Sequence, residues 1–177
     1  MLELDHRPDN SASAAIYDFA KGYAMLKSGD PEGAQMTLTA LREYVASTND
    51  KIRFHLAKNV VGVLIHILAG EIQLTDGKVE AAIDSFKQAV ALEDSLDYDE
   101  PEPLPFAARH WLGQTLLGAG QPTKAEAVFR AELEDHPHNG WSLFGLQQAL
   151  AAQSLSDASV DDDLAQSWAR ADIWLTG

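Results

Sequence analysis

Six histidines are the first residues in this sequence that could do chemistry, because imidazole binds divalent metals and exchanges protons near neutral pH. His55 and His66 are eleven residues apart and would share one helix face, but the rise between them is about 16 Å. His136 and His138 flank Pro137 and would need a third ligand from elsewhere to hold an ion. We therefore expect structural or surface roles for the histidines, and we predict no metal site and no cofactor.

A run of acidic residues raises calcium as a second possibility. Five carboxylates fall within nine residues: Asp94, Asp97, Asp99, Glu100 and Glu102. The helix–loop–helix calcium signature also needs a central glycine and a distal glutamate, and this run contains no glycine. Its prolines cannot continue a helix. We interpret residues 95–105 as a solvated acidic loop.

Sequence motifs for catalysis are absent. The chain has no Gly-x-Ser-x-Gly, no phosphate-binding glycine loop with a lysine, and no His-Glu-x-x-His. It also has no cysteine, which excludes disulfides, thiolate metal ligands and cysteine nucleophiles. We predict that the protein is not an enzyme. The alternative, a metal-dependent enzyme domain, would use His110, Glu71 and the acidic loop.

The composition is that of one acidic domain of moderate size. The 177 residues are 46% hydrophobic, and 27 acidic against 13 basic residues give a net charge of −14. This charge repels phosphate backbones, so we expect neither nucleic acid nor anionic membranes as partners. The longest apolar run, Val60 to Gly70, is too short to span a bilayer, and the N-terminus lacks signal-peptide character. We expect a soluble, cytoplasmic protein, unless a longer precursor carries an export signal.

One spacing recurs along the chain and organises its elements. Two glycines lie seven residues apart, an alanine follows five residues later, and a large apolar residue follows four residues after that. The three copies are Gly22, Gly29, Ala34 and Leu38; Gly70, Gly77, Ala82 and Phe86; and Gly113, Gly120, Ala125 and Phe129. An internal period of this kind is typical of a solenoid, in which each helical hairpin buries its apolar face against its neighbours.

Each position of the spacing has a physical interpretation. The first glycine lies inside a helix, where it costs about 1 kcal/mol of helix propensity against alanine. That cost is tolerable if the missing side chain lets another helix approach closely. The second glycine ends the helix, and proline follows soon after in Asp30-Pro31 and Gln121-Pro122, as at the start of the next helix.

Apolar periodicity and these end signals predict eight helices. Their ranges are 12–28, 31–47, 51–75, 79–94, 106–119, 122–136, 141–152 and 164–175. We divide the chain into an N-terminal arm (1–11), a helical repeat domain (12–153), and a linker with a C-terminal capping helix (154–177). The last helix carries Trp168 and Trp174 and would cover the exposed end of the core.

The most regular copy resembles the tetratricopeptide repeat family. Leu112, Gly113, Ala125, Phe129 and Pro137 match the family pattern, whereas Arg109 and Leu116 replace its aromatic positions. The chain is also similar to the C-terminal part of long bacterial proteins of this family whose role is undefined. The resemblance implies an all-α, right-handed solenoid of antiparallel helix hairpins, with three to four repeats and a C-terminal cap.

The resemblance also implies where a ligand would lie. In the family, ligands commonly contact first-helix residues on the concave face, three residues before and one after each inner glycine. These positions are Phe19, Tyr23, Ile67, Glu71, His110 and Gln114. The alternative is that Phe19, Ile67 and Tyr23 belong to the core, and the sequence leaves both interpretations open. Without a cluster of lysine and arginine, a basic or apolar ligand is the better expectation.

Our functional hypothesis is therefore a non-catalytic scaffold that binds a protein or peptide on its concave face. The main alternative is a structural repeat protein that associates with its own kind, as a homodimer. The sequence does not identify the partner.

Overall fold

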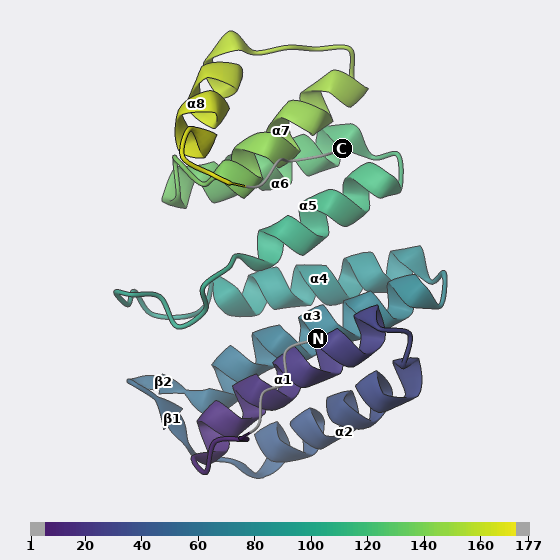
Figure 1. Cartoon of the computed structure of the whole chain (residues 1–177), viewed down its shortest axis with the longest axis vertical. Helices are drawn as coiled ribbons and strands as arrows, with labels where there is room; N and C mark the ends of the chain where they lie inside the picture. The colour runs from purple at the N-terminus through teal and green to yellow at the C-terminus, as the bar shows by residue number, and fades with distance from the viewer. Residues whose placement is uncertain (1–5, 173–177) are drawn as a thin grey trace. The chain divides into compact units, whose positions relative to one another are not determined.

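The computed structural model describes residues 6–172, whose regular secondary structure is helical apart from one short β-hairpin (Figure 1). The eight helices of this part of the chain are α1 (Ser11–Lys27), α2 (Pro31–Ser47), α3 (Ala57–Thr75), α4 (Val79–Glu93), α5 (Ala108–Gly118), α6 (Pro122–Asp135), α7 (Gly140–Ala152) and α8 (Ala158–Trp168). Three-residue turns join α1 to α2, α3 to α4 and α5 to α6. The prediction of an all-α helical repeat protein is confirmed.

The chain forms two compact units, Met1–Ala108 and Arg109–Gly177. The first contains helices α1 to α4, and the second is built from α5 to α8. The predicted ranges 1–11, 12–153 and 154–177 divide the chain by repeat content and stay predictions.

Helix α3 is the core of the first unit. It contacts α1, α2 and α4, and its fully buried side chains are Val60, Val61, Val63, Leu64, Ile67 and Leu68. Within residues 6–172 it is the one helix long and apolar enough to cross a membrane, with a mean hydropathy of 1.3. However, 72% of that stretch is buried inside the protein. Its apolar surface is therefore covered by neighbouring helices of the same unit.

The second glycine of each copy ends a helix, as predicted. Gly29, Gly77 and Gly120 have φ angles of 85°, 74° and 70°, which side chains other than glycine rarely adopt. The amide of the next residue then donates a hydrogen bond to the carbonyl five residues earlier, for example from Lys78 N to Gln73 O at 2.8 Å. Ser154 makes the same turn after α7, with a φ of 59°.

The inner glycines allow close helix contact, as predicted. A Cβ on Gly70 would lie 2.4 Å from the Phe86 ring, and a Cβ on Gly113 would lie 2.4 Å from the Phe129 ring. Phe129 is confined from a second side, because a Cβ on Gly145 would lie 2.3 Å from the same ring. The first repeat differs, since Gly22 faces Thr37 of α2 at 2.7 Å and not Leu38.

The predicted start of the third helix at Lys51 is wrong. Residues 51–56 form an antiparallel hairpin of β1 (Lys51–Ile52) and β2 (His55–Leu56), and α3 begins at Ala57. The turn places Arg53 at a φ of 57°, which a helix cannot accommodate. Contacts of the Arg53 side chain with the loop after α4 hold this conformation, and no local sequence signal announces them.

The predicted last helix, 164–175, is also shifted. Helix α8 begins at Ala158, because the side chain of Asp157 accepts a hydrogen bond from the Ser159 amide at 3.0 Å and caps the helix. Val160 is buried in the first turn, and α8 packs on α7 as a fourth hairpin. Trp174 lies outside the described residues.

Candidate functional site

In the first unit, a buried carboxylate joins the first helices of two successive repeats. Glu71 of α3 accepts a hydrogen bond from the Tyr23 hydroxyl at 2.9 Å, and its other oxygen pairs with Lys27 Nζ at 2.6 Å. Tyr23 and Lys27 are one helical turn apart on α1, and the amine lies 5.2 Å from the Tyr23 ring centroid. Both oxygens of Glu71 are therefore engaged within the unit.

The charge of this cluster is balanced internally. Partial burial acts to lower the pKa of Lys27, but the hydrogen bond and charge of Glu71 outweigh it, so the pKa of Lys27 is raised. The amine accordingly stays protonated and paired near neutral pH. Glu71 and Tyr23 were predicted from the sequence, whereas Lys27 was not. Lys27 lies one turn after Tyr23 on a predicted helix, and this spacing could have indicated that the two side chains share a face.

The two apolar candidates of the first unit are core residues. Ile67 has no exposed surface and Phe19 is 7% exposed, so neither presents a side chain to a ligand. The Phe19 ring lies 5.9 Å from the Tyr23 ring and 6.4 Å from the Phe106 ring. Of the two interpretations that the sequence left open, burial therefore supports the core role for this pair, whereas Tyr23 is half-buried.

In the second unit, His110 and Gln114 lie one turn apart on α5. Gln114 is exposed, whereas His110 is half-buried with its Nε2 3.0 Å from Ser142 Oγ of α7. Burial lowers the pKa of His110, and the nearby charge of His136 lowers it further. The imidazole is thus held neutral as a helix-to-helix contact.

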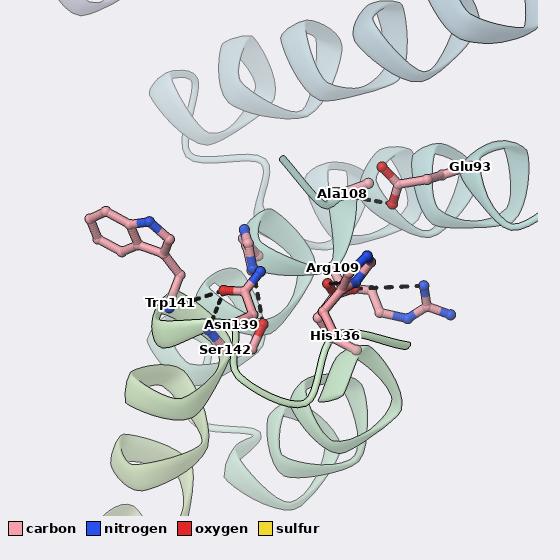
Figure 2. A network of polar contacts seen from close by, with 9 residues as sticks. Glu93, Ala108, Arg109, His136, Asn139, Trp141 and Ser142 are labelled. Atoms are coloured by element: carbon pink, nitrogen blue, oxygen red, sulfur yellow. Dashed lines mark hydrogen bonds and ion pairs between the residues drawn. The ribbon is translucent and has the colours of Figure 1, made fainter. Parts of the chain in front are cut away.

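The Asn139 side chain also hydrogen-bonds to His110, which partly opposes the lowering of the His110 pKa. Figure 2 shows Asn139 beside the start of α7. Its side-chain oxygen accepts hydrogen bonds from the amides of Trp141 and Ser142, at 3.0 and 3.2 Å, and so caps α7. The cap brings the start of α7, with buried Ser142, next to His110. These contacts position helices and leave Gln114 as the exposed candidate of this unit.

Glu132 is a buried ionisable residue that sequence analysis did not single out. It is 1% exposed on α6, its Oε1 lies 2.7 Å from His136 Nδ1, and its Oε2 lies 4.0 Å from Arg109 Nη1. Burial raises the pKa of Glu132, against the opposing effects of His136 and Arg109. The i, i+4 spacing of Glu132 and His136 could have indicated this pair.

The predicted site residues thus fall into separate groups. Phe19, Tyr23, Ile67 and Glu71 belong to the first unit, and His110 and Gln114 to the second. Within each group the polar side chains mainly bond to one another or to neighbouring helices of the same unit. Within each unit, the candidates contribute either exposed surface or contacts between helices.

The acidic loop is not solvated throughout, which corrects the sequence interpretation. The Asp99 side chain is only 1% exposed, with Oδ1 2.8 Å from the Arg53 guanidinium and Oδ2 3.3 Å from His55 Nε2. A buried carboxylate needs such partners to offset its desolvation. Within residues 6–172, no three histidine, aspartate or glutamate side chains are grouped so that they could hold a metal ion.

Residues 67–140 match the tetratricopeptide repeat profile, and no curated protein matches the chain. The crystal structure of MamA protein has a similar fold, with a TM-score of 0.55 and 15% identity over 92% of this chain and 79% of that chain. Residues 67–140 of this chain therefore contain tetratricopeptide-type repeats, within a fold of successive helix hairpins.

Proposed function

We propose that this chain is a non-catalytic scaffold that binds a protein or peptide segment through the exposed side of its first helices. Proteins built from such repeats commonly bind partners along the surface that their stacked repeats create. The proposal rests on one observation: Tyr23 and Lys27 of α1 occupy both oxygens of Glu71 on α3, so this carboxylate joins two helices. The polar candidates therefore shape a surface and do not assemble a reaction centre.

In the first unit the proposed contact surface lies on α1. Ala20, Ala24 and Lys27 are exposed there, and the half-buried Tyr23 ring lies among them. Because Lys27 neutralises Glu71, this surface offers no free carboxylate to a basic ligand. An apolar or polar segment that packs on the Tyr23 ring and the small alanines is the better fit, and the Tyr23 ring supplies most of the contact area.

In the second unit the proposed contact surface lies on α5. Gln114 is exposed and can bond to a peptide backbone through both its amide and its carbonyl. His110 and Trp111 are half-exposed beside it. This surface can be tested independently of the one on α1.

A pair of matched alanine positions tests the proposal for the first unit. Ala24→Glu places charge and bulk on the exposed side of α1, and Ala40→Glu makes the same change at an exposed position of α2. Each variant serves as bait in a pull-down from the lysate of the source cell. We expect a protein captured by the wild type to be lost with Ala24→Glu and retained with Ala40→Glu.

The same design applies to the second unit. Gln114→Glu is compared with Ala127→Glu, an exposed position of α6. A photo-crosslinking amino acid at 114 should label the captured protein, whereas one at 127 should not. Equal capture and labelling for both members of each pair would refute the assignment to first helices, while leaving the repeat fold in place.

Self-association is the alternative outcome. If the wild type captures only its own chain, and sedimentation velocity shows a dimer at micromolar concentration, the protein is a structural repeat that pairs with itself. In that case, the variant that dissociates the dimer in sedimentation velocity, Ala24→Glu or Gln114→Glu, identifies the helix at the contact.

A further inference from the structure

We propose that the β1–β2 hairpin and the loop after α4 form a second docking surface, for a partner segment that carries lysine or arginine side chains. This hairpin–loop surface consists of Phe54, Leu56 and Tyr98, with the carboxylates of Asp97, Glu100 and Glu102 in the same loop as Tyr98. Both of its parts lie outside the helix pairs, and both belong to the first unit (Figure 1).

The two parts are tied together by one side chain. The Arg53 guanidinium donates hydrogen bonds to the carbonyl oxygens of Pro101, at 2.9 Å, and Glu100, at 3.2 Å, and pairs with Asp99 at 2.8 Å. A single arginine thus binds three groups of the loop across 46 or more residues of sequence, from the turn of the hairpin. Charge-assisted contacts from one planar guanidinium to three groups fix geometry as well as contributing energy.

The two residues that link the loop to the hairpin beneath this surface, Asp99 and His55, are buried. Asp99 and His55 have side chains only 1% and 2% exposed, and the His55 ring lies tilted against Phe54, with ring centroids 4.5 Å apart. The neighbours of Asp99 in the chain, Tyr98 and Glu100, are exposed. Burial of Asp99 therefore holds the loop against the hairpin while its neighbours face solvent.

Large apolar side chains are exposed on the hairpin–loop surface. Tyr98 is 85% exposed, Phe54 49% and Leu56 39%. Single exposed apolar residues are ordinary on protein surfaces. Several on one hairpin and the loop bound to it indicate a contact site. Tyrosine and phenylalanine supply large contact areas and lose little side-chain entropy on binding, so they are enriched where proteins bind one another.

The charge around Tyr98 selects the partner. Residues 94–105 carry five carboxylates and no lysine or arginine, and Arg53, which reaches into the loop, is already paired with Asp99. The Tyr98 hydroxyl donates to Glu100 at 2.7 Å, and this contact together with the nearby carboxylates raises the pKa of Tyr98. A lysine or arginine arriving here would meet both a carboxylate and an aromatic face, whereas an acidic or phosphate-bearing partner would be repelled.

A random peptide library displayed on phage tests this surface, with the full chain as bait. We expect the enriched peptides to carry lysine or arginine next to apolar residues. The Arg53 guanidinium already lies 5.8 Å from the Phe54 ring centroid, so Tyr98 supplies the aromatic face for the cation and Phe54 an apolar contact. Loss of both in Phe54→Ala/Tyr98→Ala should weaken peptide binding about tenfold. Met36→Ala, on α2 at 75% exposure, should leave their binding unchanged.

A second comparison separates a specific site from general attraction to an acidic protein. The loop variant Asp97→Asn/Glu100→Gln/Glu102→Gln and the control Glu43→Gln/Asp84→Asn/Glu80→Gln change the net charge equally, and all six positions are exposed. We expect the loop variant to lose the peptides and the control to keep them. Equal loss in both variants, undiminished binding to Phe54→Ala/Tyr98→Ala, or no enrichment at all would overturn the proposal. Circular dichroism confirms that each variant is folded.

Discussion

The Tyr23 hydroxyl donates a 2.9 Å hydrogen bond to the Glu71 carboxylate, and so joins α1 to α3 across 48 residues of sequence. Tyr23→Phe removes this bond and leaves the ring in place. Because Glu71 is buried and charged, we expect the free energy of unfolding to fall by about 1–2 kcal/mol, measured by urea denaturation. Tyr98→Phe removes a similar bond to the exposed Glu100 and should cost close to nothing. Equal effects of the two substitutions would show that the Tyr23 bond does not stabilise the unit.

Gly113 and Gly118 lie on the same helix and make a matched pair for the packing argument. A Cβ at Gly113 would lie 2.4 Å from the Phe129 ring, whereas nothing lies within 4 Å of one at Gly118. Despite its gain in helix propensity, Gly113→Ala should lower stability by about 1–3 kcal/mol through overpacking. Gly118→Ala should be neutral or stabilising by up to about 1 kcal/mol. Thermal unfolding of both variants distinguishes these outcomes, and a stabilising Gly113→Ala would contradict the close contact.

Ser154 occupies the turn after α7 with a φ of 59°, where the earlier repeats have glycine. Ser154→Gly should relieve this conformation and raise stability by about 1 kcal/mol. Ser156→Gly, at an exposed position of the same turn without a positive φ, should be neutral or slightly destabilising, because it only frees the unfolded chain. Chemical denaturation of both variants checks this. No gain in Ser154→Gly would mean that the serine is not strained.

The neutral, half-buried His110 predicts a loss of stability in acid. Since folding lowers the pKa of His110 below its ordinary 6.5, the unfolded state binds more protons in the window below 6.5. Stability is therefore fully present above pH 6.5 and falls as the pH drops through that window. Glu132 acts in the opposite direction, because its pKa is raised above 4.5 and its contribution falls as the pH increases.

His110→Gln isolates the effect of the imidazole. We expect the unfolding free energy of this variant to depend less on pH below 6.5 than that of the wild type, in denaturation curves recorded above and below this pH. His138→Gln, at an exposed position, is the control. An unchanged slope in His110→Gln would contradict the assigned burial of the ring.

Local signals in the sequence were sufficient for most of the helices. The glycines at 29, 77 and 120 ended helices because glycine adopts the positive φ of that turn at the lowest cost, and this signal lies within a few residues of each helix end. The inner glycines Gly70 and Gly113 likewise predicted close approach, since a repeated small residue at a fixed distance from Phe86 or Phe129 implies contact. The tetratricopeptide-type repeats over residues 67–140 include two of these copies.

Long-range contacts decided the rest, because nothing near these residues in sequence specifies their partners. Arg53 adopts a turn within a predicted helix because its guanidinium binds Asp99 and the carbonyl of Pro101, 48 residues away. The same contacts bury a carboxylate that composition alone assigns to solvent. Lys27 and Glu71 are 44 residues apart, and their pairing removed the free charge that the sequence seemed to offer a basic ligand. The sequence by itself determined where most helices stop and where two of the repeats pack closely. Only the tertiary structure decided where α3 starts and which charges remain available, because desolvation and pairing depend on neighbours brought together by folding.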